Sequence, residues 1–534
     1  MELLFLKNKK TYLGVLFLLL VFLLSFLGFI YPWLNYTIFW LIFLLAVFFS
    51  FRKLEYGVFL ALVELFIGSK GYLFSFPVFN YVISLRLLIF SVLIAAYIIH
   101  IIRKKEIKFL QSNLWFSYLL LIIFIALGFL IGLKNNDNSL VFYDINAYFY
   151  LALIFPFFEV LTKKENIRKF LKWLGISAIA LAVFTLVILA DFSIFHYNNN
   201  LVEATKVETK QLEKMENLAD QPENARLAQA TKMAREKLNL TEKELSQDKP
   251  LVYRWLKDLG LAEVSYLGGR FFRIFSTSHY YLIVYFLLIL SSILFSQKRF
   301  KNSIVEYILG GFLLLIILIS FSRSFWLGLA ASFVFLIFSL PKNKRLKINL
   351  IIVFLIIMSG LILNFISPKT SQVIYNRFAS LLKPSTELAA SNRINMLKPI
   401  WQKIKENPFF GSGFGTLITF KSLIPGTELT EYINVYLYEW AYLDIVVKIG
   451  FLGLLSYLYF IFFIYKTGRH TLKYLENNQF ILVKSLLAGL MALLVIHITT
   501  PYLNHPLGIG FIMILASVFY YYLCQSNAVK KSKY

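Results

Sequence analysis

The chain has 534 residues, of which 59% are apolar, 18% aromatic and only 16% charged. Soluble domains carry about 25% charged residues, so this composition excludes an ordinary soluble protein and predicts an all-α, polytopic membrane bundle. The formal net charge of +25 does not indicate nucleic acid, because the basic residues lie in short clusters between apolar runs, where they orient helices. The single cysteine, Cys524, excludes an intramolecular disulfide.

Apolar runs long enough to cross a hydrocarbon core of about 30 Å recur along the chain. The first run follows Lys7, Lys9 and Lys10, as in a signal peptide, but it has the length of a full span and lacks a small-residue cleavage pattern. We therefore expect it to be a transmembrane helix. In all we predict about 12 to 14 spans, near residues 12–30, 36–50, 55–68, 80–101, 114–133, 145–162, 170–190, 279–296, 304–322, 324–340, 347–366, 438–465, 481–499 and 508–525.

The basic residues predict the orientation of these spans, since short loops rich in Lys and Arg stay in the cytoplasm. Alternate connections carry such clusters, whereas the short loops of the other side have only Lys70 and Lys134. We expect both termini in the cytoplasm. The clusters are at residues 7–10, 52–53, 103–108, 163–172, 298–301, 342–347, 466–473 and 530–533.

Five segments follow from this topology. N-terminal helices occupy 1–194, central helices 279–366 and C-terminal helices 438–534, and two large loops, 195–278 and 367–437, are expected outside the cytoplasm. The first loop is rich in Glu, Lys, Gln and Ala from Asn198 to Asp258, which predicts two or three exposed helices. These helices serve as a solvated spacer or lid, or as a docking arm for a partner.

Arginines gather on the predicted outer face, against the general trend for basic residues. Guanidinium groups bind phosphate through forked, charge-assisted hydrogen bonds, so this excess favours a pyrophosphate ligand at the outer leaflet. The alternatives are contacts with lipid headgroups or loop carboxylates and, for the arginine inside the fourth span, snorkelling to the interface. The arginines are Arg270, Arg273, Arg323, Arg377 and Arg393 in the loops and turns, with Arg86 in the fourth span.

The second loop ends in a candidate general base. Glu439 stands at the outer start of a span between Tyr438 and Trp440, where partial burial would suit it to accept a proton from a sugar hydroxyl. The alternative is an acidic residue that marks a helix start. The six histidines are scattered without ligand spacing, so we predict no metal site. Glycines 411, 413 and 415 match neither phosphate-binding fingerprint and are expected to form a tight turn.

The order of these motifs resembles the O-antigen ligase and O-antigen polymerase family. The motifs are Ser322-Arg-Ser-Phe-Trp326, then Arg393, Trp401, Pro408 and Gly411-Ser-Gly413, then Glu439-Trp-Ala-Tyr-Leu443 and Gly450-Phe-Leu-Gly453, all within residues 265–465. Ligases of this family commonly have histidine and asparagine where this chain has Glu439 and Trp440. The difference favours repeat-unit polymerases, or relatives that use another acceptor.

The resemblance implies a metal-independent, inverting glycosyltransferase without a cofactor, in the inner membrane of a bacterium. Its donor would be a glycan on undecaprenyl pyrophosphate, and its acceptor a glycan, lipid or protein, with membrane lipids around it. Glu439 would be the base, and Arg393 and Arg323 would act with it in catalysis. Substrate-binding candidates are Arg273, Arg270, Arg377, Arg86 and Trp401.

Two other classes remain open at this point. A lipid-linked oligosaccharide flippase or other polysaccharide transporter would suit the number of spans, but no internal repeat is evident. A scaffold of a polysaccharide export complex would make the charged loop the main feature. In an enzyme, the outer arginines and Glu439 should converge.

Overall fold

The computed structural model describes residues 9–78, 81–195, 250–268, 271–295, 304–340, 388–423 and 430–531. In this part of the chain, nine helices are long and apolar enough to cross a membrane. Shorter apolar helices, namely His279–Phe295, Ile304–Ile319 and Arg323–Phe338, accompany them. The predicted fold class, an all-α polytopic membrane protein, is confirmed.

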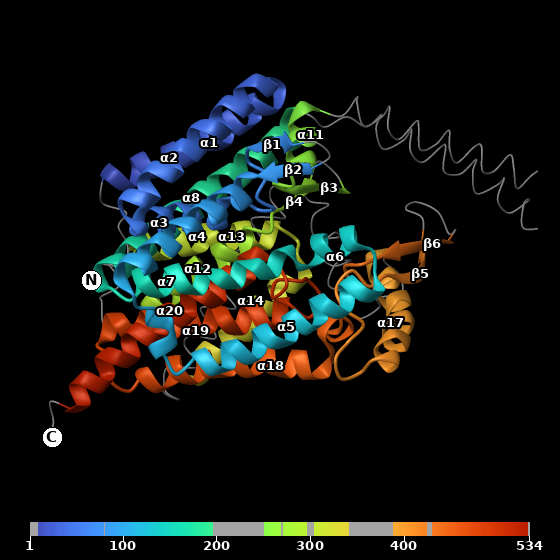
Figure 1. The fold of residues 1–534 in the computed structure, drawn as a ribbon. Coiled ribbons are helices and arrows are strands. Elements are labelled where there is room, and N and C mark those ends of the chain that lie inside the picture. The colour runs from blue at the N-terminus through green and yellow to red at the C-terminus, as the bar shows by residue number, and fades with distance from the viewer. Residues whose placement is uncertain are drawn as a thin grey trace, which may run out of the picture.

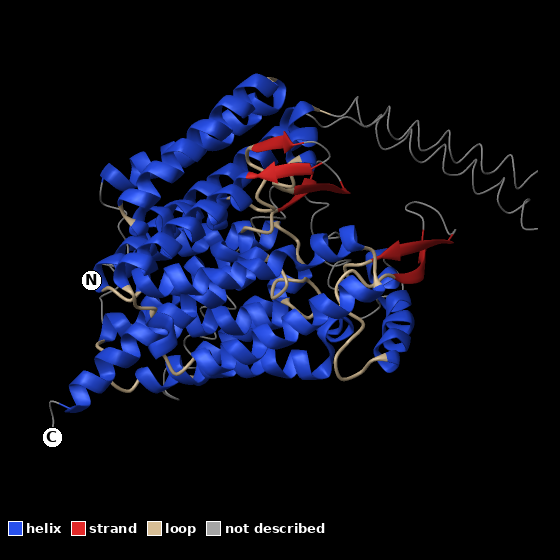
Figure 2. Ribbon diagram, in the orientation of Figure 1, coloured by secondary structure: helices blue, strands red, loops and turns tan. Residues whose placement is uncertain are grey.

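Helices form nearly all of the described structure, as Figure 2 shows. The helices are α1 (Lys9–Ile30), α2 (Pro32–Arg52), α3 (Leu54–Ile67), α4 (Leu85–Lys104), η2 (Lys108–Gln111), α5 (Trp115–Asn135), α6 (Asn138–Ile145), η3 (Asn146–Leu153), α7 (Ile154–Leu161), α8 (Lys164–Ala190), η4 (Asp191–Phe195), α11 (Leu251–Asp258), α12 (His279–Phe295), α13 (Ile304–Ile319), α14 (Arg323–Phe338), α17 (Leu388–Glu406), α18 (Ala441–Thr471), α19 (Asn477–Ile496) and α20 (Pro506–Lys531). The strands are β1 (Ser75–Val78), β2 (Tyr81–Ser84), β3 (Glu263–Gly268), β4 (Phe271–Phe275), β5 (Ile418–Leu423) and β6 (Thr430–Val435).

The long helices run roughly parallel or antiparallel, so the bundle has two ends (Figure 1). At one end α1 begins and α20 finishes, and we call it the terminal end. At the opposite end lie α11, α17 and the strands, and we call it the hairpin end. Each pair of neighbouring strands forms an antiparallel hairpin, β1 with β2, β3 with β4 and β5 with β6. Their registers pair Ser75 with Ser84, Ser265 with Arg273, and Ile418 with Val435.

The observed helices follow the predicted spans closely, because long apolar stretches are stable in a bilayer only as helices. The prediction for 347–366 lies outside the described residues. Two spans become α-helical later in the chain than expected. The run 80–101 starts as strand β2 and becomes helical only at Leu85, because the Ser84 hydroxyl accepts the Leu87 N–H and caps α4. The run 145–162 is a 3₁₀ helix to Leu153 and an α-helix only from Ile154.

The interior of the bundle is formed by the later helices. Every residue of α12 from His279 to Ser292 is buried. In the apolar 18-residue stretches of α19 and α20, 72% and 78% of the residues are buried, against 22% and 17% in those of α1 and α2. The first two helices therefore form a peripheral hairpin along one side of the bundle (Figure 1).

The two large loops contain more than helices. Most of the charged stretch from Asn198 lies outside the described residues, so the two or three helices expected there stay a prediction. The end of that loop forms α11 and the β3–β4 hairpin. The described part of the second loop contains α17, a glycine-rich turn at residues 408–415 and the β5–β6 hairpin.

Candidate active site

Arg393 and Glu439 form an ion pair at the hairpin end. The Nε of Arg393, on α17, donates to Oε2 of Glu439, which stands two residues before α18. The indole Nε1 of Trp440 donates to the backbone oxygen of Arg393 over 2.7 Å. The Arg393 and Glu439 side chains are 26% and 47% exposed, so a substrate can reach both. Two of the three predicted catalytic residues are thus brought together from separate elements.

The position of Arg393 follows from the way α17 packs. Met396, Ile400 and Ile404 recur at helical spacing and are buried against Tyr438 and the first turns of α18. Arg393 lies one turn before Met396 along the same side of the helix. Burial of this apolar side of α17 therefore places the Arg393 guanidinium beside Glu439, the residue that follows Tyr438.

The glycine-rich turn fills a break in α18. Gly450 has φ 73° and ψ 177°, so it is not helical. The break leaves carbonyls of the preceding turn without helical partners. The N–H of Ser412 donates to the carbonyl oxygen of Val447 over 2.7 Å. The N–H of Gly413 donates to the carbonyl oxygen of Lys448 over 3.1 Å. The turn thus replaces helical hydrogen bonds that the break removes.

The hydrogen bonds on the other side of the break are made in the same way. The N–H of Phe451 donates to the oxygen of Pro408 over 2.8 Å, and that of Leu452 donates to Phe409 over 3.3 Å. Residues 408–413 and the two halves of α18 are therefore one hydrogen-bonded unit.

The amides of this turn are engaged by the protein itself. Besides Ser412 and Gly413, the N–H of Phe414 donates to the oxygen of Gly128 over 3.2 Å. The N–H of Gly415 donates to a carboxylate oxygen of Asp144 over 2.9 Å. Glycines 411, 413 and 415 all have positive φ, which only glycine adopts readily. They form a tight turn, as predicted.

A buried charge cluster lies beneath the pair of Arg393 and Glu439. The Nζ of Lys448 is 2.5 Å from Asp144 and 2.8 Å from Asp444, and none of these side chains is more than 1% exposed. Asn504 donates to Asp444 over 2.6 Å. Asp444 also accepts the backbone N–H of Tyr438 over 3.2 Å. The cluster therefore fixes the backbone next to Glu439.

Sequence reasoning did not select this cluster, although a signal was present. Asp444 and Lys448 are four residues apart within an apolar run, and ionisable residues in a span are functional candidates by default. Their third member, Asp144, comes from α6, and nothing in the sequence links it to α18.

Arg273 and Arg323 lie at a neighbouring turn of the hairpin end. The Nε of Arg273, on β4, donates to the backbone oxygen of Ser320 over 3.0 Å, and its guanidinium lies 5.0 Å from the ring of Phe275. Ser320 is in the turn between α13 and α14, and Arg323 is the first residue of α14. Both arginines are partly exposed. They thus belong to two adjoining segments.

The turn after α19 connects this region to the Glu439 region. The hydroxyl of Tyr442, three residues after Glu439, donates to Leu494 over 2.9 Å, and its ring lies 4.6 Å from that of His497. Three residues after His497, the hydroxyl of Thr500 lies 3.0 Å from the hydroxyl of Ser324, the neighbour of Arg323. One turn therefore contacts both segments that carry the candidate residues.

The other candidates lie apart or outside the described structure. Arg86 is buried, 3% exposed, and its Nε donates to Glu64 over 2.7 Å. It neither snorkels nor faces the outer surface. Trp401 is 49% exposed on α17. Arg270 and Arg377 lie outside the described residues. In the described ranges, no three or more His, Cys, Asp or Glu side chains are grouped so that they could hold a metal ion.

The comparison with protein families addresses the same segment of the chain. Residues 308–458 match the O-antigen ligase family model. This confirms the predicted resemblance. The matched O-antigen ligase segment contains the turn before α14, all of α17, the glycine-rich turn and the Arg393–Glu439 pair. No curated protein matches the chain.

Proposed function

We propose that this membrane protein is a glycosyltransferase that acts at the hairpin end. Its donor is a glycan on undecaprenyl pyrophosphate, and it extends or transfers that glycan as a polymerase or a ligase-like enzyme. The hairpin end faces the outside of the cytoplasmic membrane. The observation that carries the proposal is the exposed Arg393–Glu439 ion pair inside the O-antigen ligase segment.

The chemistry is a single inverting displacement. Glu439 accepts the proton of an acceptor hydroxyl, whose oxygen forms a bond with the anomeric carbon of the donor. The bond from that carbon to the pyrophosphate oxygen breaks, and its electron pair leaves on undecaprenyl pyrophosphate. Proton transfer to a positioned carboxylate contributes about 10² to 10⁴ in rate.

Arg393 has two partners in this scheme. Without donor, its guanidinium neutralises the Glu439 carboxylate. A pyrophosphate offers it a stronger, forked acceptor, and the carboxylate is then free to take the proton. Arg323 and Arg273, on the neighbouring segments, stabilise the charge that develops on the leaving group. Arg270, Arg377 and Trp401 are further substrate-binding candidates.

The test measures glycan transfer by full-length protein in membranes supplied with lipid-linked glycan. Glu439→Gln should lower transfer about 100-fold or more, and Arg393→Ala by a similar factor. Lipid-linked donor should accumulate unextended in cells that carry either variant. Glu406→Gln is the matched control, because Glu406 is an exposed carboxylate on α17 that pairs with Lys403.

Both variants should keep the thermal stability of the wild type, because the Arg393–Glu439 pair is exposed. If Glu439→Gln transfers glycan as well as Glu406→Gln does, Glu439 is not the base. If Arg393→Ala is equally active, the glycosyltransferase proposal fails at this site.

A further inference from the structure

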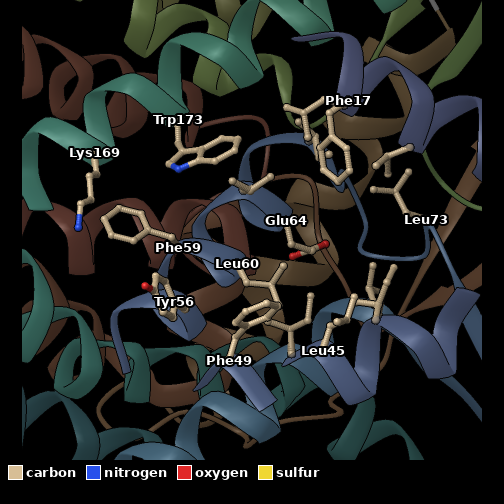
Figure 3. A pocket seen from close by; sticks show the side chains of 17 residues that line it. Phe17, Leu45, Phe49, Tyr56, Phe59, Leu60, Glu64, Leu73, Lys169 and Trp173 are labelled. Atoms are coloured by element: carbon tan, nitrogen blue, oxygen red, sulfur yellow. The ribbon is translucent and has the colours of Figure 1, made fainter. Parts of the chain in front are cut away.

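An apolar cavity of about 520 Å³ lies between the peripheral α1–α2 hairpin and helices α3, α4 and α8. Its walls are almost entirely hydrocarbon and aromatic, as Figure 3 shows for Phe17, Leu45 and Trp173. The one carboxylate in the wall, Glu64, is already bound by Arg86. The volume is in the range of ligand sites, about 300 to 1,000 Å³. In a membrane protein, a cavity of this size and lining can hold a hydrocarbon chain.

A second hollow, about 270 Å³ in volume, lies at the terminal end of the same helices. Its lining contains five Lys and Arg side chains against two carboxylates, Glu55 and Glu159. Arg52, Lys53 and Arg103 line it and are exposed, and none of these three has an ion pair within the part of the chain that the structure describes. The positive-inside trend accounts for cations on this side of a membrane, but not for their gathering around one hollow.

The apolar cavity and the basic hollow adjoin each other at the turn between α2 and α3. Lys169 lines the apolar cavity and lies 3.6 Å from Glu55, which lines the basic hollow. Phe49 and Tyr56, on either side of that turn, line the apolar cavity with rings 5.9 Å apart. Figure 3 places Lys169 at one edge of the cavity, far from Leu73.

We infer that these two hollows form one binding site for an anionic glycerophospholipid of the inner leaflet. Its phosphate headgroup lies against Arg52, Lys53 and Arg103, and one acyl chain enters the apolar cavity past Phe49 and Tyr56. Basic pockets between helices on the cytoplasmic side bind anionic headgroups, and each nearby cation strengthens binding about fivefold. Such a lipid would fill the space behind the weakly buried α1–α2 hairpin and hold it to α3 and α8.

The test uses full-length protein that has been stripped of lipid in mild detergent. Dioleoyl phosphatidylglycerol and dioleoyl phosphatidylcholine are added separately, and binding is measured by native mass spectrometry and by the apparent melting temperature. We expect wild-type protein to bind phosphatidylglycerol at least tenfold more tightly. The triple variant Arg52→Gln/Lys53→Gln/Arg103→Gln should lose that preference. Val63→Phe, which narrows the apolar cavity, should weaken binding of both lipids.

The matched control removes three cations of the same end that do not line the basic hollow, Lys466→Gln/Arg469→Gln/Lys473→Gln. It should keep the preference of the wild type. Equal binding by the two triple variants would overturn the proposal, because the preference would then reflect net charge alone. Recovery of a polyprenyl pyrophosphate, instead of a phospholipid, from protein purified without added lipid would also overturn it and assign the cavity to a donor lipid. None of these readouts depends on glycan transfer.

Discussion

The ammonium group of Lys448 lies 2.5 Å from the carboxylate of Asp144, although the two residues are 304 positions apart. This contact joins α6 to the first turns of α18. The same lysine binds Asp444, so one cation holds two buried carboxylates together under the proposed active site.

Lys448→Met should strongly destabilise the protein. The substitution leaves Asp144 and Asp444 buried without their cation, and the loss of one partner of a buried pair costs about 3 to 5 kcal/mol. We expect a clear fall of the apparent melting temperature in detergent. Lys466→Met, at the terminal end of the same helix, is the control and should have little effect. Equal melting temperatures would show that the cluster contributes nothing to stability.

Gly450→Ala should disrupt the glycine-rich turn. A side chain at φ 73° is strained, and its Cβ would lie 2.0 Å from the carbonyl oxygen of Phe409. We expect a loss of more than about 2 kcal/mol of stability together with a loss of glycan transfer. Gly311→Ala is the matched control, because a Cβ on Gly311 of α13 meets no atom within 4 Å. A Gly450→Ala variant as stable as that control would contradict the assignment of the break.

Substitutions of Arg86 and Glu64 separate a structural role from a role in substrate binding. Arg86→Leu alone leaves the Glu64 carboxylate buried and unpaired, and we expect a loss of about 3 to 5 kcal/mol. The double variant Arg86→Leu/Glu64→Leu should recover most of that stability, since replacing a buried pair with apolar residues is often neutral. If Arg86 binds no substrate, the double variant should also recover glycan transfer. A stable but inactive double variant would instead make Arg86 a substrate ligand.

His505 should make stability sensitive to acid. Burial lowers the pKa of His505 to about 3, and the positive charges of Arg86 and Lys70 act in the same direction. Its Nδ1 accepts the N–H of Leu507 at the start of α20, over 3.3 Å, and protonation would remove this acceptor. An unfolded histidine binds its proton at about pH 6.5. The unfolded state therefore takes up more protons than the folded state below that pH, and stability falls as the pH drops from 6.5 toward 3.

The variant His505→Asn tests that dependence. Asparagine retains a side-chain acceptor for the helix N-terminus but does not titrate. We expect the melting temperatures at pH 5 and pH 7.5 to lie a few degrees closer together in the variant than in the wild type. An unchanged difference would assign the acid sensitivity to other groups.

Hydropathy predicted the helices well because a bilayer leaves an apolar run few alternatives to a helix. It failed where an apolar run forms another structure. Residues 81–84 read as the start of a span, yet they pair with β1, and a run through Gly450 reads as one continuous helix although α18 is broken there. In both places the structure depends on contacts with another segment, which periodicity does not record.

The candidate site was predictable only in part, because it too depends on contacts between segments that are distant in the sequence. Chemistry and motif order selected Arg393 and Glu439, and these residues form an ion pair. Arg86 was selected by the same reasoning on arginine, but Glu64 on the preceding helix binds it. Asp144 could not be linked to Lys448 from sequence, because only the folded bundle brings α6 beside α18.

The break in α18 also affects how the protein responds to the membrane around it. Residues 408–413 are hydrogen-bonded to both halves of α18, at residues 447 and 448 before the break and at 451 and 452 after it. Helices adapt to bilayers of different thickness by tilting. Because residues 408–413 bind both halves of α18 across Gly450, a change in the tilt of residues 451–471 acts on the half that follows Glu439. We therefore expect the geometry around Glu439 to depend on lipid chain length.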